Sequence, residues 1–183
     1  VAMSVLGGSW PAVFVRAASL GLSGRESLAQ LERERRLKPR GQALLEAVSR
    51  RFDLASPGAQ AALLGVPAPA LVWVAPPAAY RSSAGTDVTA GEIDLVARST
   101  LNGRLMATVP ASVSVAIAVA AALPGTLVNE LARTLPGVPT RIGHPSGAAA
   151  VGADVGRHQG QWRVEKVVIS HGARRLMSGR VYA

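Results

Sequence analysis

One continuous apolar run constrains the fold of this chain more than any other segment. Residues 113–123, VSVAIAVAAAL, contain no charged side chain, and Pro124-Gly125 ends the run. The run is too short to cross a bilayer, which takes about 20 residues, so it predicts a buried helix over 112–123. Because a helix without a polar face has to be surrounded by protein, the rest of the chain must enclose it.

Short β-rich segments can form that enclosure. Asn102-Gly103 predicts a hairpin, because both residues tolerate positive φ. Alternation in one strand places Asp94 and Arg98 on the same face. Arg98 could reach a carboxylate from this strand, but a solvated position is expected for it. We expect an α+β fold in which a curved sheet wraps around the central apolar helix. The predicted strands are 12–17, 70–75, 93–99, 104–109, 126–128, 139–143, 147–154, 161–169 and 174–182.

Two further helices are predicted before the second strand. Ser23 and Glu26 have the spacing of a capping box, which predicts a helix over 25–37. Pro39 is expected to open a second helix, because proline in a first turn sacrifices no hydrogen bond. Residues 53–68 are rich in Pro, Gly and Ala and are expected to form a loop. The expected apolar face of the second helix is Leu44, Leu45, Val48 and Phe52.

Length and composition favour one domain over residues 1–183 without a disulfide framework, since cysteine is absent. The net charge of +9 raises the question of nucleic acid, but the charges are scattered and only seven aromatic residues are present, so no nucleic-acid partner is expected. No membrane-spanning segment or signal peptide is recognisable, and a cytoplasmic location is expected. Val1 at the start predicts a piece of a longer chain.

The turn His144-Pro145-Ser146-Gly147 lies between two short apolar runs. Proline, serine and glycine could serve the geometry of a tight turn alone, with His144 bonded to backbone. A histidine and a serine placed together could also hold a ligand. His158 and His171 are expected at the surface, and Trp73 and Trp162 in the core.

Several phrases, in this order and spacing, resemble the second half of the PrpF family. They are 10-WPAVFVRAASLGLSG-24, 74-VAPPAAY-80, 92-EIDLVAR-98, 123-LPGTLV-128, 143-GHPSG-147 and 174-RRLMSGRV-181. This family includes 2-methylaconitate cis–trans isomerase, methylitaconate isomerase and 4-oxalomesaconate tautomerase. The resemblance implies a diaminopimelate epimerase-like fold, with two similar domains and the active site between them.

The resemblance also implies a cofactor-independent isomerase that moves a proton across an allylic system in a small unsaturated di- or tricarboxylic acid. Such a reaction needs an acid/base pair and donors that hold the carboxylates. In the family this pair looks to be a lysine and a cysteine in the first half, so no catalytic residue is carried over to this segment. Lys38 and Lys166 do not match the family's catalytic lysine. The partners implied are the carboxylic acid and the missing N-terminal sister domain, with a homodimer left open.

Substrate binding is what the resemblance carries over to this segment. His144, Pro145, Ser146 and Gly147 match the family turn, where a hydroxyl, backbone N–H groups and an imidazole suit a carboxylate. The start of the central helix offers free N–H groups and a positive dipole end. Ser112 is the polar side chain nearest that end, and its alternative role is to cap the helix. No metal site is expected.

Two departures from the family pattern bear on activity. Trp10 stands where the family usually has a substrate-facing asparagine, and Pro110 removes a backbone donor at the entry to the central helix. They leave a second hypothesis open, an inactive member or fragment that binds carboxylates or a protein. A basic nucleic-acid-binding domain is the third hypothesis and rests on charge alone.

Overall fold

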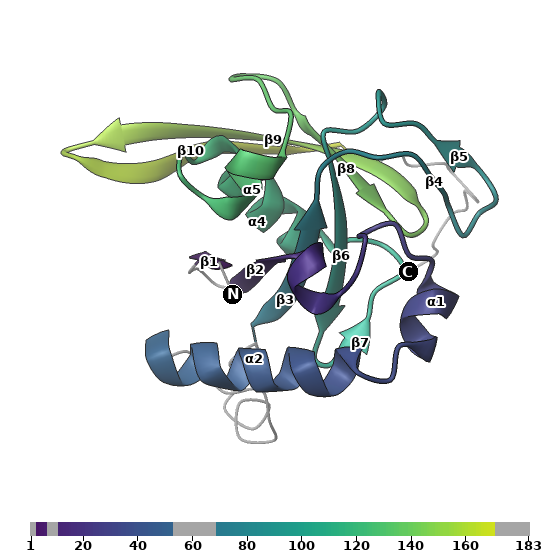
Figure 1. The fold of residues 1–183 in the computed structure, drawn as a ribbon. Coiled ribbons are helices and arrows are strands. Elements are labelled where there is room, and N and C mark those ends of the chain that lie inside the picture. Colours follow the sequence, from purple (N-terminus) through teal and green to yellow (C-terminus); the bar gives the residue numbers. More distant parts are fainter. Residues whose placement is uncertain (1–2, 7–10, 53–68, 171–183) are drawn as a thin grey trace, which may run out of the picture.

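A curved eight-stranded sheet organises the fold (Figure 1). The computed structural model describes residues 3–6, 11–52 and 69–170, with only the backbone given for 3–6. The strand order is β1-β2-β3-β6-β8-β9-β10, and β7 pairs with β6; the β2/β3 and β6/β8 pairs are parallel and the others antiparallel. The strands are β1 (Met3–Leu6), β2 (Ala12–Arg16), β3 (Ala70–Ala75), β6 (Leu95–Leu101), β7 (Arg104–Leu105), β8 (Thr140–His144), β9 (Gly147–His158) and β10 (Gln161–Ile169). A separate two-stranded sheet pairs β4 (Tyr80–Arg81) with β5 (Asp87–Val88).

The apolar helix α4 (Ala111–Ala122) packs against one face of this sheet, as its sequence predicted. Ile117, Ala118 and Ala121 are fully buried, and α4 is buried along most of its length. The core around it comes from five strands, whose contributing side chains are Ala12, Phe14, Ala70, Val72, Val74, Leu95, Ala97, Ile142 and Val151. The predicted curved sheet around a central apolar helix is therefore confirmed.

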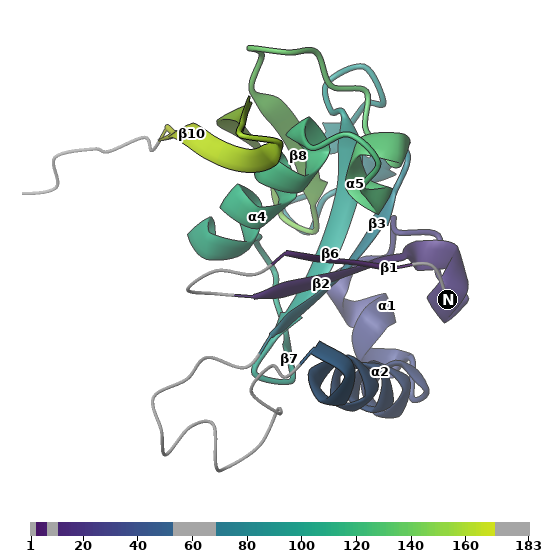
Figure 2. The same cartoon turned by 90° about the vertical axis from the view of Figure 1, so that its left-hand side faces the viewer.

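Helices α1 (Leu28–Arg33) and α2 (Leu37–Phe52) cover the opposite face of β2 and β3 (Figure 2). The single helix predicted over 25–37 is wrong, because the capping box forms later: Ser27 accepts from the Gln30 N–H, and Gln30 accepts from Ser27. The Ser23–Glu26 bonds exist but close a turn before α1. The expected apolar face of α2 is half right, since Leu45 and Val48 are buried whereas Phe52 is 49% exposed.

A short helix, α5 (Leu127–Leu131), stands where a strand over 126–128 was predicted. The Thr126 side chain caps α5 by accepting from the Asn129 N–H at 3.1 Å. The same hydroxyl donates to the carbonyl of Ala120, and the Asn129 amide donates to Ala121 O at 2.6 Å. The strand prediction is wrong because α5 supplies partners to the carbonyls at the end of α4, which a helix terminus otherwise leaves unsatisfied.

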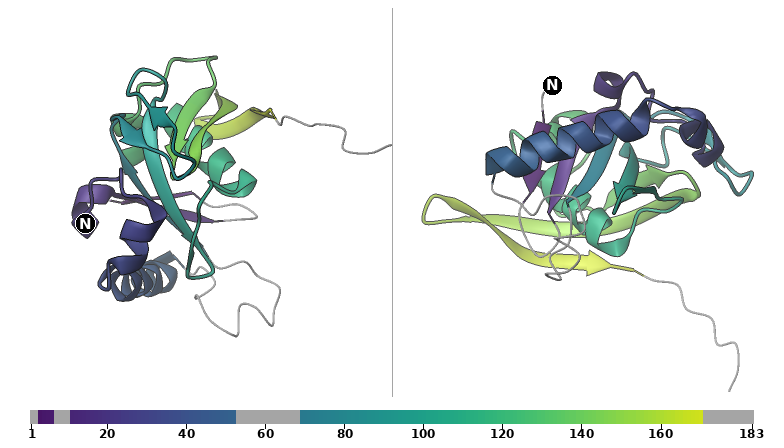
Figure 3. Two further views of the ribbon diagram at one scale, coloured as in Figure 1. Left: turned by 90° about the vertical axis from the view of Figure 1, so that its right-hand side faces the viewer. Right: turned by 90° about the horizontal axis from the view of Figure 1, so that it is seen from below.

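The β9–β10 hairpin forms a long ribbon that projects from the body of the molecule (Figures 1 and 3). Val167 and Ile169 pack against the core, but Trp162, near the far end of the ribbon, is 45% exposed and lies under Arg157. The core position predicted for Trp162 is therefore wrong, and the position predicted for Trp73, which is fully buried, is confirmed.

The Asn102-Gly103 hairpin is confirmed, with φ of 50° and 73°, although its return strand is only Arg104–Leu105. No helix in the described ranges has the length and apolarity needed to span a membrane. The predictions for Trp10, the loop 53–68, His171 and the strand 174–182 lie outside the described residues.

Candidate functional site

The predicted binding turn joins β8 to β9, with Pro145 and Ser146 connecting the paired residues His144 and Gly147. Two other segments hold it in place. The Ser83 N–H donates to Pro145 O at 2.7 Å, and the Ser83 hydroxyl donates to Ser146 Oγ at 3.2 Å. The turn is therefore anchored by residues more than sixty positions away in sequence.

The turn also lies against the segment that leads into α4. The Ser146 N–H and hydroxyl both donate to Ala107 O, at 3.1 and 2.8 Å. Ala107 lies three residues before Pro110, the N-cap of α4, so the turn and the approach to the helix entrance are adjacent. Both Ser146 donors are satisfied by protein in this arrangement, and a carboxylate could use them only in exchange for Ala107.

His144 lies buried in the turn, where one ring nitrogen contacts the backbone. Its side chain is 8% exposed, and its Nδ1 accepts from the Ser146 N–H at 3.3 Å. This contact assigns the proton of a neutral ring to Nε2. Burial, followed by the positive charge of Arg98, lowers the pKa of His144 below its usual value. His144 is thus a neutral Nε2–H donor near pH 7.

Ser112 is placed less favourably than predicted. It is the second residue of α4 and is half-buried, while Pro110 occupies the N-cap without any side-chain cap bond. The capping role considered for Ser112 is therefore wrong. Within the described ranges, no hydrogen bond joins Ser112 to the turn.

Arg98 and Tyr80 lie against the turn; the sequence analysis assigned no site role to Tyr80, and to Arg98 only the less favoured alternative of reaching a carboxylate. The Tyr80 hydroxyl lies 2.8 Å from His144 O and 2.5 Å from Gly147 O. The Arg98 guanidinium stacks 4.9 Å from the centre of the Tyr80 ring and donates to Gly143 O at 3.3 Å. Arg98 is 1% exposed, so the expectation of a solvated face is wrong. Burial lowers its pKa to about 10 and, for Tyr80, raises the pKa of the phenol.

An ion pair between buried Asp94 and exposed Arg141 fixes the strand that ends in the turn. Asp94 accepts from the Arg141 backbone N–H at 2.7 Å and from Arg141 Nη2 at 2.6 Å. The hydrogen bonds from Arg141 leave Asp94 buried but fully partnered, which is the condition for a buried charge to be tolerated. The pairing sets β8 beside β6, and its sequence signal was a carboxylate inside an otherwise apolar strand.

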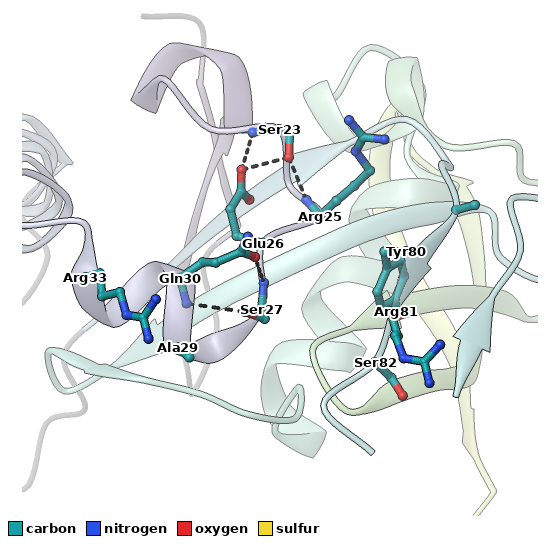
Figure 4. A pocket seen from close by; sticks show the side chains of 11 residues that line it. Ser23, Arg25, Glu26, Ser27, Ala29, Gln30, Arg33, Tyr80, Arg81 and Ser82 are labelled. Carbon is teal, nitrogen blue, oxygen red and sulfur yellow. Dashed lines mark hydrogen bonds between the residues drawn. The ribbon is translucent and has the colours of Figure 1, made fainter. Parts of the chain in front are cut away.

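A polar pocket of about 660 Å³ opens next to the turn, with Tyr80 in its wall (Figure 4). Arg33 lies on the α1 side, and Arg81 lies beside Tyr80 on the other side. Although burial raises the pKa of the Glu26 carboxyl, hydrogen bonds from the Ser23 hydroxyl and N–H outweigh that effect and lower it. Arg81 pairs with Asp87 at 3.3 Å. This leaves Arg25 and Arg33 against the Glu26 carboxylate, so the pocket is suited to anions. Its lining is Ser23, Arg25, Glu26, Ser27, Ala29, Gln30, Arg33, Ala79, Tyr80, Arg81 and Ser82.

The pocket residues were missed because they come from two separate segments, 23–33 and 79–82. Two phrases of the family resemblance end there, at Gly24 and Tyr80, which was the available signal. Among the described residues, no group of His, Cys, Asp or Glu side chains could hold a metal ion.

Comparison with known proteins agrees with this geometry. The chain is 34% identical over 178 residues to a 2-methyl-aconitate isomerase of Shewanella oneidensis, covering 93% of this chain and 43% of that protein. It is 32% identical over 177 residues to the 2-methyl-aconitate isomerase of Cupriavidus necator, with the same coverage of both proteins. It is 27% identical over 174 residues to a 3-methylitaconate isomerase of Eubacterium barkeri, covering 94% of this chain and 45% of that protein.

Structural similarity points the same way. The crystal structure of a methylitaconate-delta-isomerase superposes with a TM-score of 0.82 and 27% identity, over 97% of this chain and 45% of that one. The fold is thus diaminopimelate epimerase-like, as the resemblance implied. The chain spans less than half the length of these relatives. The family described as PrpF protein matches residues 1–183, and the chain belongs to the PrpF family.

Proposed function

We propose that the protein containing this chain is a cofactor-independent isomerase of a small unsaturated di- or tricarboxylic acid. The observation that carries the proposal is similarity over 93% of the chain to isomerases of 2-methylaconitate. A 3-methylitaconate isomerase is related as well, so the proposal covers the class of acid and no single acid.

The proposed reaction is a proton shift across an allylic system. A base removes a proton from the carbon next to the double bond, and the electron pair spreads over the allyl unit and its carboxylate. An acid then returns a proton at a different carbon. Negative charge grows on the carboxylate oxygens during this step, so fixed donors near those oxygens lower the barrier.

This chain supplies the carboxylate-binding half of the cleft in this proposal. The His144 Nε2–H is the foremost donor. The imidazole is neutral near pH 7, and the Ser146 N–H holds its ring in place. The arginines of the neighbouring pocket attract the acid. We assign the acid/base pair to an N-terminal sister domain, since this chain has no cysteine. A homodimer and a cytoplasmic location stay predictions.

A second candidate is an inactive member that binds carboxylates or a protein partner. Pro110 at the N-cap of α4 and the engaged donors of Ser146 favour it, because both reduce the number of free donors facing a ligand. The two candidates share the binding surface and differ in proton transfer.

Deuterium uptake separates them. The full-length protein would be incubated in heavy water with 2-methylaconitate, aconitate or 3-methylitaconate, and the allylic protons followed by NMR. The isomerase reading expects uptake with at least one acid, and none with residues 1–183 alone as the matched control. Binding without uptake across the panel would instead support the inactive member.

A further inference from the structure

Arg98 is a buried cation without an ion-pair partner among the described residues. Its Nε donates to Glu26 O and its Nη1 to Ala97 O, both at 2.9 Å, and Nη1 also donates to Gly143 O. Its Nη2 is buried and has no hydrogen-bond partner within residues 11–52 and 69–170. Burying a charge that is not paired costs folding free energy. An arginine kept at such a cost points to a role beyond packing.

The contacts of Arg98 converge on the binding turn. It bonds the carbonyl of Gly143 directly, and it stacks on Tyr80, whose hydroxyl lies within hydrogen-bond distance of the carbonyls of His144 and Gly147. The guanidinium therefore holds the Gly143 carbonyl, and the single hydroxyl proton of Tyr80 serves the carbonyls of His144 and Gly147. Carbonyl oxygens held in this way cannot rotate toward an anion, which they would repel.

Arg98 also acts on the imidazole of His144. Its positive charge disfavours a second proton on that ring, in addition to the effect of burial. Around His144 in the described residues, the charged or titratable groups that the structure gives are Arg98 on β6 and Tyr80 on β4. Arg98 is thus connected to both parts of the turn that a carboxylate would meet, its backbone and its imidazole donor.

We propose that Arg98 is a positioning residue, which acts through Tyr80 and Gly143 to hold the segment 143–147 in its carboxylate-binding conformation. It does not touch the substrate. The expected effect on KM rests on the proposed function. The expected effect on the turn rests only on the geometry of the ligand-free protein.

The test uses the full-length protein with Arg98→Met, Tyr80→Phe and the double variant. Arg104→Met, which removes an exposed arginine on the neighbouring strand β7, is the matched control. NMR titration of the imidazoles of ligand-free protein gives the His144 pKa, with the signal assigned by His144→Gln. We expect Arg98→Met to raise this pKa and Arg104→Met to leave it unchanged.

Kinetics with the acid that shows deuterium uptake give the second measurement. We expect Arg98→Met and Tyr80→Phe to raise KM by about ten- to a hundredfold with a smaller change in kcat, the range that slight misplacement produces. Because both act through one unit, the double variant should be no worse than the poorer single variant. Arg98→Lys, which retains the cation, should recover part of the loss.

An unchanged KM and an unchanged His144 pKa in Arg98→Met, with only a lower unfolding temperature, would overturn the inference. If Arg98→Met does not fold, Tyr80→Phe carries the test through KM, and an unchanged KM in Tyr80→Phe would then overturn the inference. Absence of deuterium uptake in the unsubstituted protein would reject the proposed function. The titration still decides the inference in that case, because it needs no substrate.

Discussion

Gly143 is the position where a single methyl group should disturb the binding turn most directly. A Cβ there would lie 2.9 Å from Ile93 Cδ1 and 3.2 Å from both Cε1 and the hydroxyl of Tyr80. The Ile93 methyl ends a flexible chain and can move. Tyr80 is fixed by the carbonyls of His144 and Gly147, so the strain falls on the turn itself.

The size of the effect follows from a comparison with Gly91, where an added Cβ meets no atom within 4 Å. Neither glycine has a positive φ, so alanine reduces the freedom of the unfolded chain equally in both variants. That gain is about 0.4–1 kcal/mol. Overpacking in Gly143→Ala costs about 1–3 kcal/mol. The two variants should therefore differ by about 1–3 kcal/mol, with Gly91→Ala the more stable.

Urea denaturation followed by circular dichroism measures this difference, provided that the two variants share one slope with denaturant. A Gly143→Ala variant as stable as Gly91→Ala would refute the close approach of Tyr80 to the turn, and with it the positioning argument for Arg98.

Three further predictions address other parts of the structure. The pKa of His144 is lowered in the folded state, so below the usual histidine pKa of 6.5 the unfolded state binds more protons than the folded state. The free energy of unfolding should therefore fall as the pH is lowered through 6.5. His144→Gln should reduce this loss, measured by unfolding curves at pH 7.5 and 5.5. Asp94→Asn should destabilise by about 1–3 kcal/mol in urea, because Arg141 loses a charged acceptor, and a value near zero would contradict a structural role for the Asp94–Arg141 pair. Thr126→Ala should cost about 1 kcal/mol and lower the melting temperature, whereas Thr126→Ser keeps the capping hydroxyl and should not.

The central helix and most of the sheet were predictable because their signals are local. The helix was expected over 112–123 and is observed as Ala111–Ala122, since a run without a polar face allows few alternatives. The segment 126–128 misled because Thr-Leu-Val is β-rich by composition. Its helix forms to satisfy carbonyls at the end of α4, a requirement that arises only after α4 is placed.

The predictions for Arg98 and Trp162 were wrong for the same reason, since both assumed what covers a face of the strand. An arginine on an alternating strand indicates a solvated face only where that face meets water, whereas Arg98 lies opposite Trp73 of β3, on the face that α1 and α2 cover. A tryptophan on a strand is buried only where that part of the strand packs on the core. The β9–β10 ribbon extends past the core, and Trp162 lies on the extended part. Sequence alternation records the two faces of a strand; what covers each face is decided by tertiary packing.

The binding turn was also predictable only in part. Its residue types could be read from the sequence, and the resemblance selected His144 and Ser146 among several polar residues. Segments distant in sequence decide which donors are free. Ala107 O accepts from both donors of Ser146. The Ser146 N–H also contacts Nδ1 of His144, so the ring proton lies on Nε2 and is left to donate. Serine therefore acts in this turn as the residue that sets the tautomer of the histidine. A variant such as Ser146→Ala, which retains that backbone N–H, should accordingly affect carboxylate binding less than His144→Gln, and the opposite order of affinities would assign the donor to the serine.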